Sequence, residues 1–174
     1  MKKIILILIS ILFALIIFAQ EQENYEIKME GYLVWSETEA TDTFIPLDTV
    51  FPGDEILFVL SYTNNTEQII TDFYISALIP EGTTYIPESA TGDGEYESKF
   101  ENIPETEETI LFFSVDGGES FQEPPIFIEE EVGGITVRKL ATIDQFTNIK
   151  WLINKEILEE ETINLIYKVK VSNQ

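Results

Sequence analysis

Histidine and cysteine are both absent from this chain of 174 residues. Without cysteine, the protein cannot use disulfides, and a lipid-modified cysteine near the N-terminus is excluded. Without histidine, it lacks the commonest general base and the commonest transition-metal ligand. We therefore expect its stability to come from a hydrophobic core, and we expect a protein that is not an enzyme and needs no cofactor.

Basic residues are scarce, since 10 Lys and Arg stand against 32 Asp and Glu, for a net charge of −22. Lys2 and Lys3 are two of the ten, so the chain beyond residue 19 carries a net charge of −24. Binding to nucleic acid or to an anionic membrane surface requires a basic surface. The composition therefore excludes nucleic acid as an expected partner, and it excludes the headgroups of an anionic membrane as well.

The N-terminus has the pattern of a secretory signal. Two lysines precede a nearly unbroken apolar run at residues 4–19, and polar residues follow at once. The run is shorter than the roughly 20 residues that span a bilayer. We predict a signal peptide at residues 1–19 and export to the periplasm, the cell surface or the extracellular space. Because Ile17 is large for its place before a cleavage site, the alternative is an uncleaved anchor, with residues 4–19 as the only membrane contact.

The rest of the chain, residues 20–174, reads as a single all-β domain. Short apolar runs with a period of two alternate with turn residues, and no window shows a helical stripe. This pattern suggests two packed antiparallel sheets, with a less regular middle and one weak strand at 96–100. The predicted strands are 25–35, 55–63, 71–78, 84–87, 110–115, 125–129, 136–140, 148–152 and 162–171.

Two segments carry the motifs of a known family. Residues 50–65 read VFPGDEILFVLSYTNN, and residues 78–90 read LIPEGTTYIPESA. In this order they resemble the repeat called domain of unknown function 11, whose pattern is a Pro-Gly-Asp turn, a strand ending in Tyr-x-Asn, and a later Pro-x-Gly, Tyr and Ser. The matching residues are Pro52, Gly53, Asp54, Tyr62, Asn64, Pro80, Gly82, Tyr85 and Ser89.

A third segment, FFSVDGGESF at residues 112–121, precedes a late tryptophan, Trp151. Together they look like the long bacterial version of the repeat, which has a Ser-x-Asp-Gly-Gly-x-x-Phe turn. The turn residues here are Asp116, Gly117 and Gly118. The resemblance covers about residues 48–171 in a single copy. It implies an immunoglobulin-like antiparallel β-sandwich, a building block of cell-envelope or surface proteins with no enzyme activity.

The chemistry of the motif residues points to structural roles. Pro52 presets the dihedral angle of its turn, Gly53 permits a positive φ, and Asp54 is expected to bond the backbone two residues on. Trp151, between Ile149 and Ile153 in an alternating run, is expected to fill the core between the sheets. None of these residues is expected to be catalytic.

Calcium is the one metal that the composition supports, because it prefers oxygen ligands. The candidate ligands lie in Gly-rich loops, although no EF-hand spacing is present. They are Asp93, Glu95, Asp116 and Glu119. A sugar-binding surface would instead use exposed aromatic rings, for which the candidates are Tyr25, Tyr32, Trp35 and Tyr74.

The sequence therefore predicts a non-catalytic, exported β-sandwich that acts in structure or in protein–protein interaction. Its expected partners are envelope or extracellular proteins, because export, the β pattern and the family resemblance all agree with that role. The alternative is a module that binds Ca²⁺ or a glycan, which differs in predicting a measurable effect of a small ligand.

Overall fold

The structure is a computed structural model that describes residues 25–36, 42–90 and 100–172. Within these ranges the chain forms ten β-strands, two short 3₁₀ turns and no α-helix. No helix in this part of the chain has the length and apolarity needed to cross a membrane. The predicted all-β class and antiparallel sandwich are confirmed. The predicted signal segment and the strand predicted at 96–100, apart from Phe100, lie outside the described residues.

The larger sheet has five antiparallel strands in the order β2-β1-β3-β10-β5. They are β1 (Tyr25–Ser36), β2 (Asp42–Pro46), β3 (Glu55–Asn64), β5 (Thr83–Tyr85) and β10 (Thr162–Val171). The alternating pattern predicts all of them except β2, whose sequence DTFIP contains only two large apolar side chains. β2 pairs with residues 32–36 of β1 at the edge of the sheet, where backbone pairing holds a strand that is little buried.

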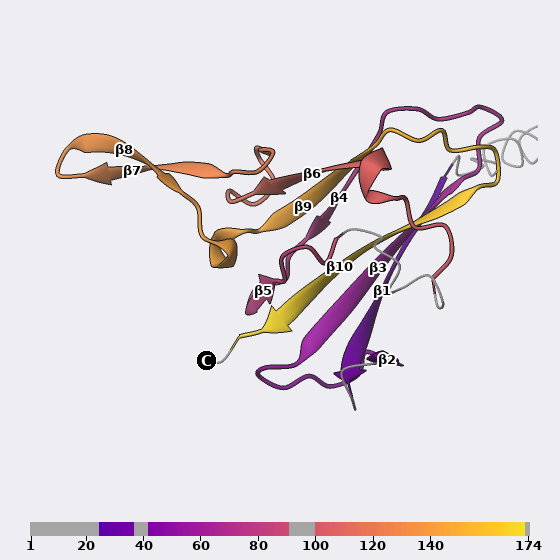
Figure 1. Cartoon of the computed structure of the whole chain (residues 1–174), viewed down its shortest axis with the longest axis horizontal. Coiled ribbons are helices and arrows are strands. Elements are labelled where there is room, and N and C mark those ends of the chain that lie inside the picture. Colours follow the sequence, from indigo (N-terminus) through magenta and orange to yellow (C-terminus); the bar gives the residue numbers. More distant parts are fainter. Residues whose placement is uncertain (1–24, 37–41, 91–99, 173–174) are drawn as a thin grey trace, which may run out of the picture.

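The smaller sheet has three antiparallel strands in the order β4-β9-β6. They are β4 (Phe73–Leu78), β6 (Thr109–Ser114) and β9 (Asn148–Ile153). This sheet lies over the larger one (Figure 1), and one core cluster draws side chains from both. Trp151 of β9 is 0% exposed, and its ring lies 5.9 Å from that of Tyr167 on β10. The two sheets therefore share one core, as the sequence predicts.

The central strands of the larger sheet are buried on both faces. Ile166 lies on the otherwise polar side of β10, yet it is buried in a second cluster with Leu57 and Val59 of β3. Phe100 and Ile103, from the chain before η1 (Thr106–Glu108), pack against this cluster. The segment that follows residue 99 thus covers the back of the sheet, which explains why an apolar residue interrupts the alternation.

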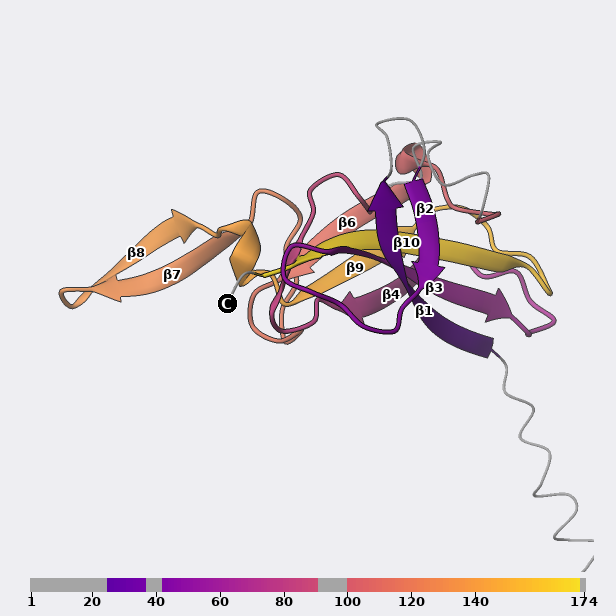
Figure 2. The ribbon, with the colours of Figure 1, turned by 90° about the horizontal axis from the view of Figure 1, so that it is seen from below.

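β7 (Phe127–Val132) and β8 (Ile135–Leu140) form a hairpin of their own, separate from both sheets. It projects from one end of the sandwich, as both perpendicular views show (Figures 1 and 2). Gly133 and Gly134 have φ values of 63° and 81° and form the two-residue turn that such a hairpin requires. The sequence predicts both strands, but the expectation that they belong to the packed sheets is wrong.

Candidate functional site

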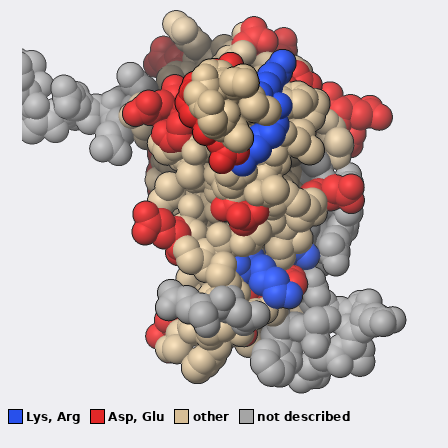
Figure 3. Space-filling model, turned by 90° about the vertical axis from the view of Figure 1, so that its left-hand side faces the viewer, with Lys and Arg blue, Asp and Glu red and all other residues tan. Residues whose placement is uncertain are grey.

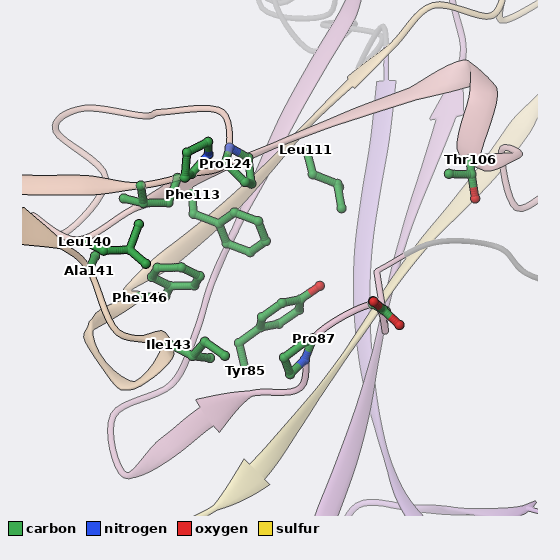
Figure 4. Close-up of a pocket in the computed structure, with 13 residues that line it drawn as sticks. Tyr85, Pro87, Thr106, Leu111, Phe113, Pro124, Leu140, Ala141, Ile143 and Phe146 are labelled. Carbon is green, nitrogen blue, oxygen red and sulfur yellow. The ribbon is translucent and has the colours of Figure 1, made fainter.

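An apolar pocket lies on the flank of the sandwich, between the edge strands β5 and β6 (Figure 4). Its volume is about 570 Å³, which is a usual size for a site that buries a small ligand or a few side chains. The residues that line it are Tyr85, Pro87, Glu88, Thr106, Leu111, Phe113, Pro124, Pro125, Ile126, Leu140, Ala141, Ile143 and Phe146.

Aromatic rings from both sheets meet in this pocket. The ring centroids of Tyr85 on β5 and Phe113 on β6 are 5.0 Å apart, and Phe113 stacks on Phe146 at 4.8 Å. Burial raises the pKa of Tyr85 to about 12, so its hydroxyl stays neutral at physiological pH. The pocket therefore offers apolar walls and a neutral hydroxyl.

Polar chemistry in the pocket is sparse. Among the described residues that line it, Glu88 is the only charged one, and the hydroxyl groups belong to Tyr85 and Thr106. General acid–base catalysis needs a group whose pKa lies near the operating pH, and nucleophilic catalysis needs a nucleophile paired with a base. This arrangement is suited to burying an apolar group.

The outer face of the smaller sheet is a second apolar surface, which we call the aromatic face and define by Tyr74, Leu78, Ile110, Phe112, Phe121, Lys150 and Leu152. The Nζ of Lys150 lies 4.3 Å from the ring centroid of Phe121, 5.2 Å from that of Phe112 and 5.7 Å from that of Tyr74. None of the three strands contains Asp or Glu, although the chain has 32. An apolar face of this kind is typical of a contact surface, because the outer face of an antiparallel sheet is normally polar.

Neither surface can be assigned through a relationship to a known protein. No family model, curated protein or solved structure matches this chain. The resemblance to domain of unknown function 11 therefore stays a prediction. The roles of its motif residues must be judged from their geometry.

The Pro-Gly-Asp turn leads into β3 and is tied to the end of β10. Gly53 has a φ of 94°, which satisfies the expected need for glycine. Its NH donates to the carbonyl of Val171 over 2.9 Å. The Asp54 carboxylate accepts from the NH of Phe51, three residues earlier, over 2.8 Å. The expectation that Asp54 bonds the backbone two residues on is wrong, because the turn folds back toward its own start.

The next motif residues are also structural. Tyr62 is buried, with its ring centroid 4.1 Å from that of Phe73. Asn64 is buried and donates to three backbone carbonyls. In the Pro80-Glu81-Gly82 turn, Gly82 has a φ of 78°, in the left-handed region that favours glycine. The structure thus places these residues in the core and in turns, away from the pocket and the aromatic face.

Asp116 organises the loop after β6. Its carboxylate accepts hydrogen bonds from the hydroxyl groups of Ser114 and Ser120, each at 2.6 Å, and from the NH of Ser120 at 3.0 Å. Gly117 and Gly118 continue the loop with φ values of 78° and 91°. These hydrogen bonds, of which the one from Ser114 has the largest effect, hold the pKa of Asp116 well below its usual range.

We expect an NMR titration to give the Asp116 carboxyl a midpoint clearly below the ordinary 3.8. Ser120→Ala should raise that midpoint, because the charged form then loses one donor; Glu119→Ala, at an exposed neighbour, should leave it in place. The folded-state pKa is lowered, so the anchoring of the loop is present above the unfolded pKa and is lost as the pH falls through the folded one. An ordinary midpoint would contradict the hydrogen-bonded geometry.

The proposed calcium ligands are only partly placed. Asp93 and Glu95 lie outside the described residues. Asp116 is already held by its serine donors, and Glu119 is exposed beside it. In the ranges that the structure covers, no group of three or more Asp or Glu side chains is placed to hold a metal ion. Calcium binding stays a prediction, and a shift in melting temperature at millimolar Ca²⁺ would test it.

The aromatic candidates separate into different environments. Tyr25 and Tyr74 are exposed, whereas Tyr32 is partly buried against Phe100, with a centroid distance of 5.4 Å. The side chain of Trp35 lies outside what the structure describes. Of the four, only Tyr74 belongs to the aromatic face. Lys150, at the centre of that face, was not among the predicted functional residues, although the alternation in 148–152 places it on the side opposite the buried Trp151.

Proposed function

We propose that this protein is a non-catalytic module, exported to the cell envelope or the extracellular space, that acts through protein–protein contact. The observation that carries the proposal is the aromatic face: an apolar surface without acidic side chains in its strands, on a chain with a net charge of −22. Export is supported by the signal pattern of residues 1–19. The predicted family, if shared, agrees with a role in envelope architecture.

The edge of the same sheet supports the proposal. β4 is an edge strand, and the NH of Ile79 donates to the carbonyl of Thr147 over 2.8 Å at its end. By the alternation of an antiparallel ladder, the backbone groups of Tyr74 and Ser76 face away from β9. A strand from a partner can pair with these groups and extend the sheet. It would then lie beside the exposed side chains of Tyr74 and Leu78.

The charge distribution defines the kind of partner. Stable contacts have a desolvated apolar centre and a polar rim. Here the centre is apolar with one cation, Lys150, and the rest of the molecule is strongly acidic. A partner with an apolar strand and a basic rim would therefore be attracted over a distance and would bind without burying a carboxylate of this sheet.

The test uses a photo-crosslinking amino acid at Ser76 in the full chain, expressed in the source cells. We expect an adduct with a discrete exported protein. The intact mass of the unmodified protein from the same cell fraction also shows whether residues 1–19 are removed. Leu78→Lys should abolish the adduct, because it places a charge in the apolar centre. Ile27→Lys, at a similarly exposed apolar side chain on β1, should not. The absence of an adduct, or an equal loss of adduct with both variants, would refute the proposal.

The aromatic face also favours a second function, glycan binding, because sugars stack on exposed rings such as Tyr74. The three rings around Lys150 would form the platform. Retardation by a neutral polysaccharide in a native gel, lost in Tyr74→Ala, would favour this function over protein contact. If the ligand is a glycan, the probe at Ser76 should form no adduct with a protein.

A further inference from the structure

The hairpin β7–β8 and the flank pocket are neighbouring features. Leu140, at the end of β8, and Ala141, which follows it, both line the pocket (Figure 4), and so does Ile126, which precedes β7. The NH of Ala141 donates to the carbonyl of Ile126 over 2.9 Å and closes the base of the hairpin. The pocket therefore lies at the base of the hairpin, one hairpin length from its tip.

The tip of the hairpin is apolar, and we call Val132, Ile135 and Val137 the knob. Val132 and Ile135 lie opposite each other in the register and are 57% and 68% exposed. Val137 is also exposed and lies on the same face, two residues beyond Ile135. A hairpin of two strands is marginally stable in water, and this one pairs with no other described strand. An exposed apolar knob on such an arm is typical of a contact element.

We propose that the knob of one copy occupies the flank pocket of a second copy, and that the exchange is reciprocal in a closed dimer. Six residue pairs give the hairpin a length of about 20 Å, at about 3.3 Å per residue. When two such hairpins lie antiparallel, the tip of each reaches the base of the other, where the pocket is. In a dimer with two-fold symmetry, each knob therefore fills the pocket of the other copy, and the assembly is closed.

Two contacts are needed for the dimer to be stable. Stable interfaces bury roughly 800 Å² on each partner, which is more than the few side chains of one knob can supply. Reciprocal exchange doubles the knob-and-pocket contact and adds the contact between the two arms. This requirement favours the closed dimer over an open chain in which each copy uses its knob and its pocket on different neighbours.

The charge of the hairpin also suits a second copy of the chain. Residues 127–140 carry a net charge of −1, from Glu129, Glu130 and Glu131 against Arg138 and Lys139, whereas the whole chain carries −22. Figure 3 faces the end from which the hairpin projects and shows Lys and Arg gathered beside Asp and Glu there. The hairpin is thus an element with little net charge on a molecule whose copies otherwise repel each other.

The antiparallel arrangement limits the remaining repulsion. It places the two acidic sandwiches at opposite ends of the paired arms. Their separation then exceeds the screening length, which is roughly 8 Å at physiological salt. Within the arm, the ammonium of Lys139 pairs with Glu130, and the guanidinium of Arg138 lies 4.1 Å from the ring centroid of Phe127. The distance over which charges interact grows as the salt concentration falls, so the repulsion between the two acidic sandwiches then increases. We expect the dimer to weaken as the salt concentration is lowered.

The first test is sedimentation velocity on the full chain, purified as the cell delivers it. We expect a concentration-dependent dimer, and Val132→Glu combined with Ile135→Glu should weaken it by about thirtyfold or more, the effect of a hot-spot contact. The matched control is Ile69→Glu combined with Leu158→Glu, which adds the same charge at two exposed apolar residues outside the hairpin and the pocket. Unchanged far-ultraviolet circular dichroism spectra, and melting temperatures compared at a concentration at which every chain is a monomer, establish that both variants fold.

The second test uses the absence of cysteine from the chain. A chain with Ile135→Cys, mixed with a chain with Ile143→Cys in the pocket, should form a disulfide when added diamide removes two electrons and two protons from the pair of thiols. Ile69→Cys in place of Ile135→Cys should not. A monomer at every concentration, an open series of oligomers, a dimer indifferent to the knob variant, or crosslinking of Ile135→Cys only with itself would each overturn the reciprocal exchange.

Discussion

Asn64→Ala is expected to lower the free energy of unfolding by about 3 kcal/mol or more, although it removes only a small side chain. The Nδ2 group of Asn64 donates to the carbonyls of Gln68, Ile157 and Leu158 at 2.9 to 3.1 Å. Its Oδ1 accepts from the NH and the hydroxyl of Thr66 at 3.0 and 2.6 Å. Each of these polar groups that loses its partner away from water costs about 1 kcal/mol.

Asn64 matters because it joins two loops that are far apart in the sequence. Its backbone NH donates to the carbonyl of Glu161, and its carbonyl accepts from the NH of Glu160, at 3.0 and 2.8 Å. The residue therefore sets the path of the chain after β3 and of the chain before β10. No other side chain type of this size presents both a double donor and an acceptor.

Urea unfolding followed by tryptophan fluorescence measures the effect of Asn64→Ala. Asn65→Ala is the matched control, because the same change at the exposed neighbouring residue should stay within about 0.5 kcal/mol of the unsubstituted protein. A loss below 1 kcal/mol for Asn64→Ala would mean that the two loops are held by other contacts.

The strands that the sequence predicts best are those in which one face meets the core. In β10, Ile163, Leu165, Tyr167 and Val169 alternate with polar residues that are at least partly exposed, with Ile166 as the exception, and the structure gives the predicted bounds. β9 follows the same rule around Trp151. Period-two alternation is a direct consequence of a sheet with two unlike faces, so no knowledge of the partner strand is needed.

The failures have a different physical origin. β2 is held by pairing with β1, which leaves no apolar pattern to read. Ile166 breaks the alternation of β10 because Phe100 and Ile103 cover the face that was expected to meet water. The hairpin β7–β8 has strand-like sequence, but alternation does not say whether a strand pairs with a sheet or projects from it. These features depend on contacts between segments distant along the chain.

The candidate site was harder to foresee than the fold. The pocket combines β5, β6, the loop before β7 and the turn η2 (Ile143–Gln145), so no local motif marks it. In the sequence its residues read as ordinary strand and loop positions. The aromatic face was partly accessible, because strand alternation places Phe112 and Lys150 outward. Its significance rests on the lack of acidic residues in three strands that come together only in the fold.

Trp151→Ala should cost about 3 to 5 kcal/mol, which is the usual penalty for emptying a large buried aromatic site. Trp151 is 0% exposed and lies between Ile75 of β4 and Leu111 of β6 in the register of the smaller sheet. Its ring also faces Tyr167 of the larger sheet. The cavity would open where the two sheets meet, so neither sheet can close it alone.

Leu152→Ala is the control that makes the Trp151 experiment specific. Leu152 is the next residue of the same strand, but it is only partly buried and lies on the outer face, so its loss should cost about 1 kcal/mol or less. Urea unfolding followed by circular dichroism compares the two variants without relying on the deleted fluorophore. Equal losses would mean that the two faces of β9 are equivalent, which a two-layer sandwich with an exposed aromatic face does not allow.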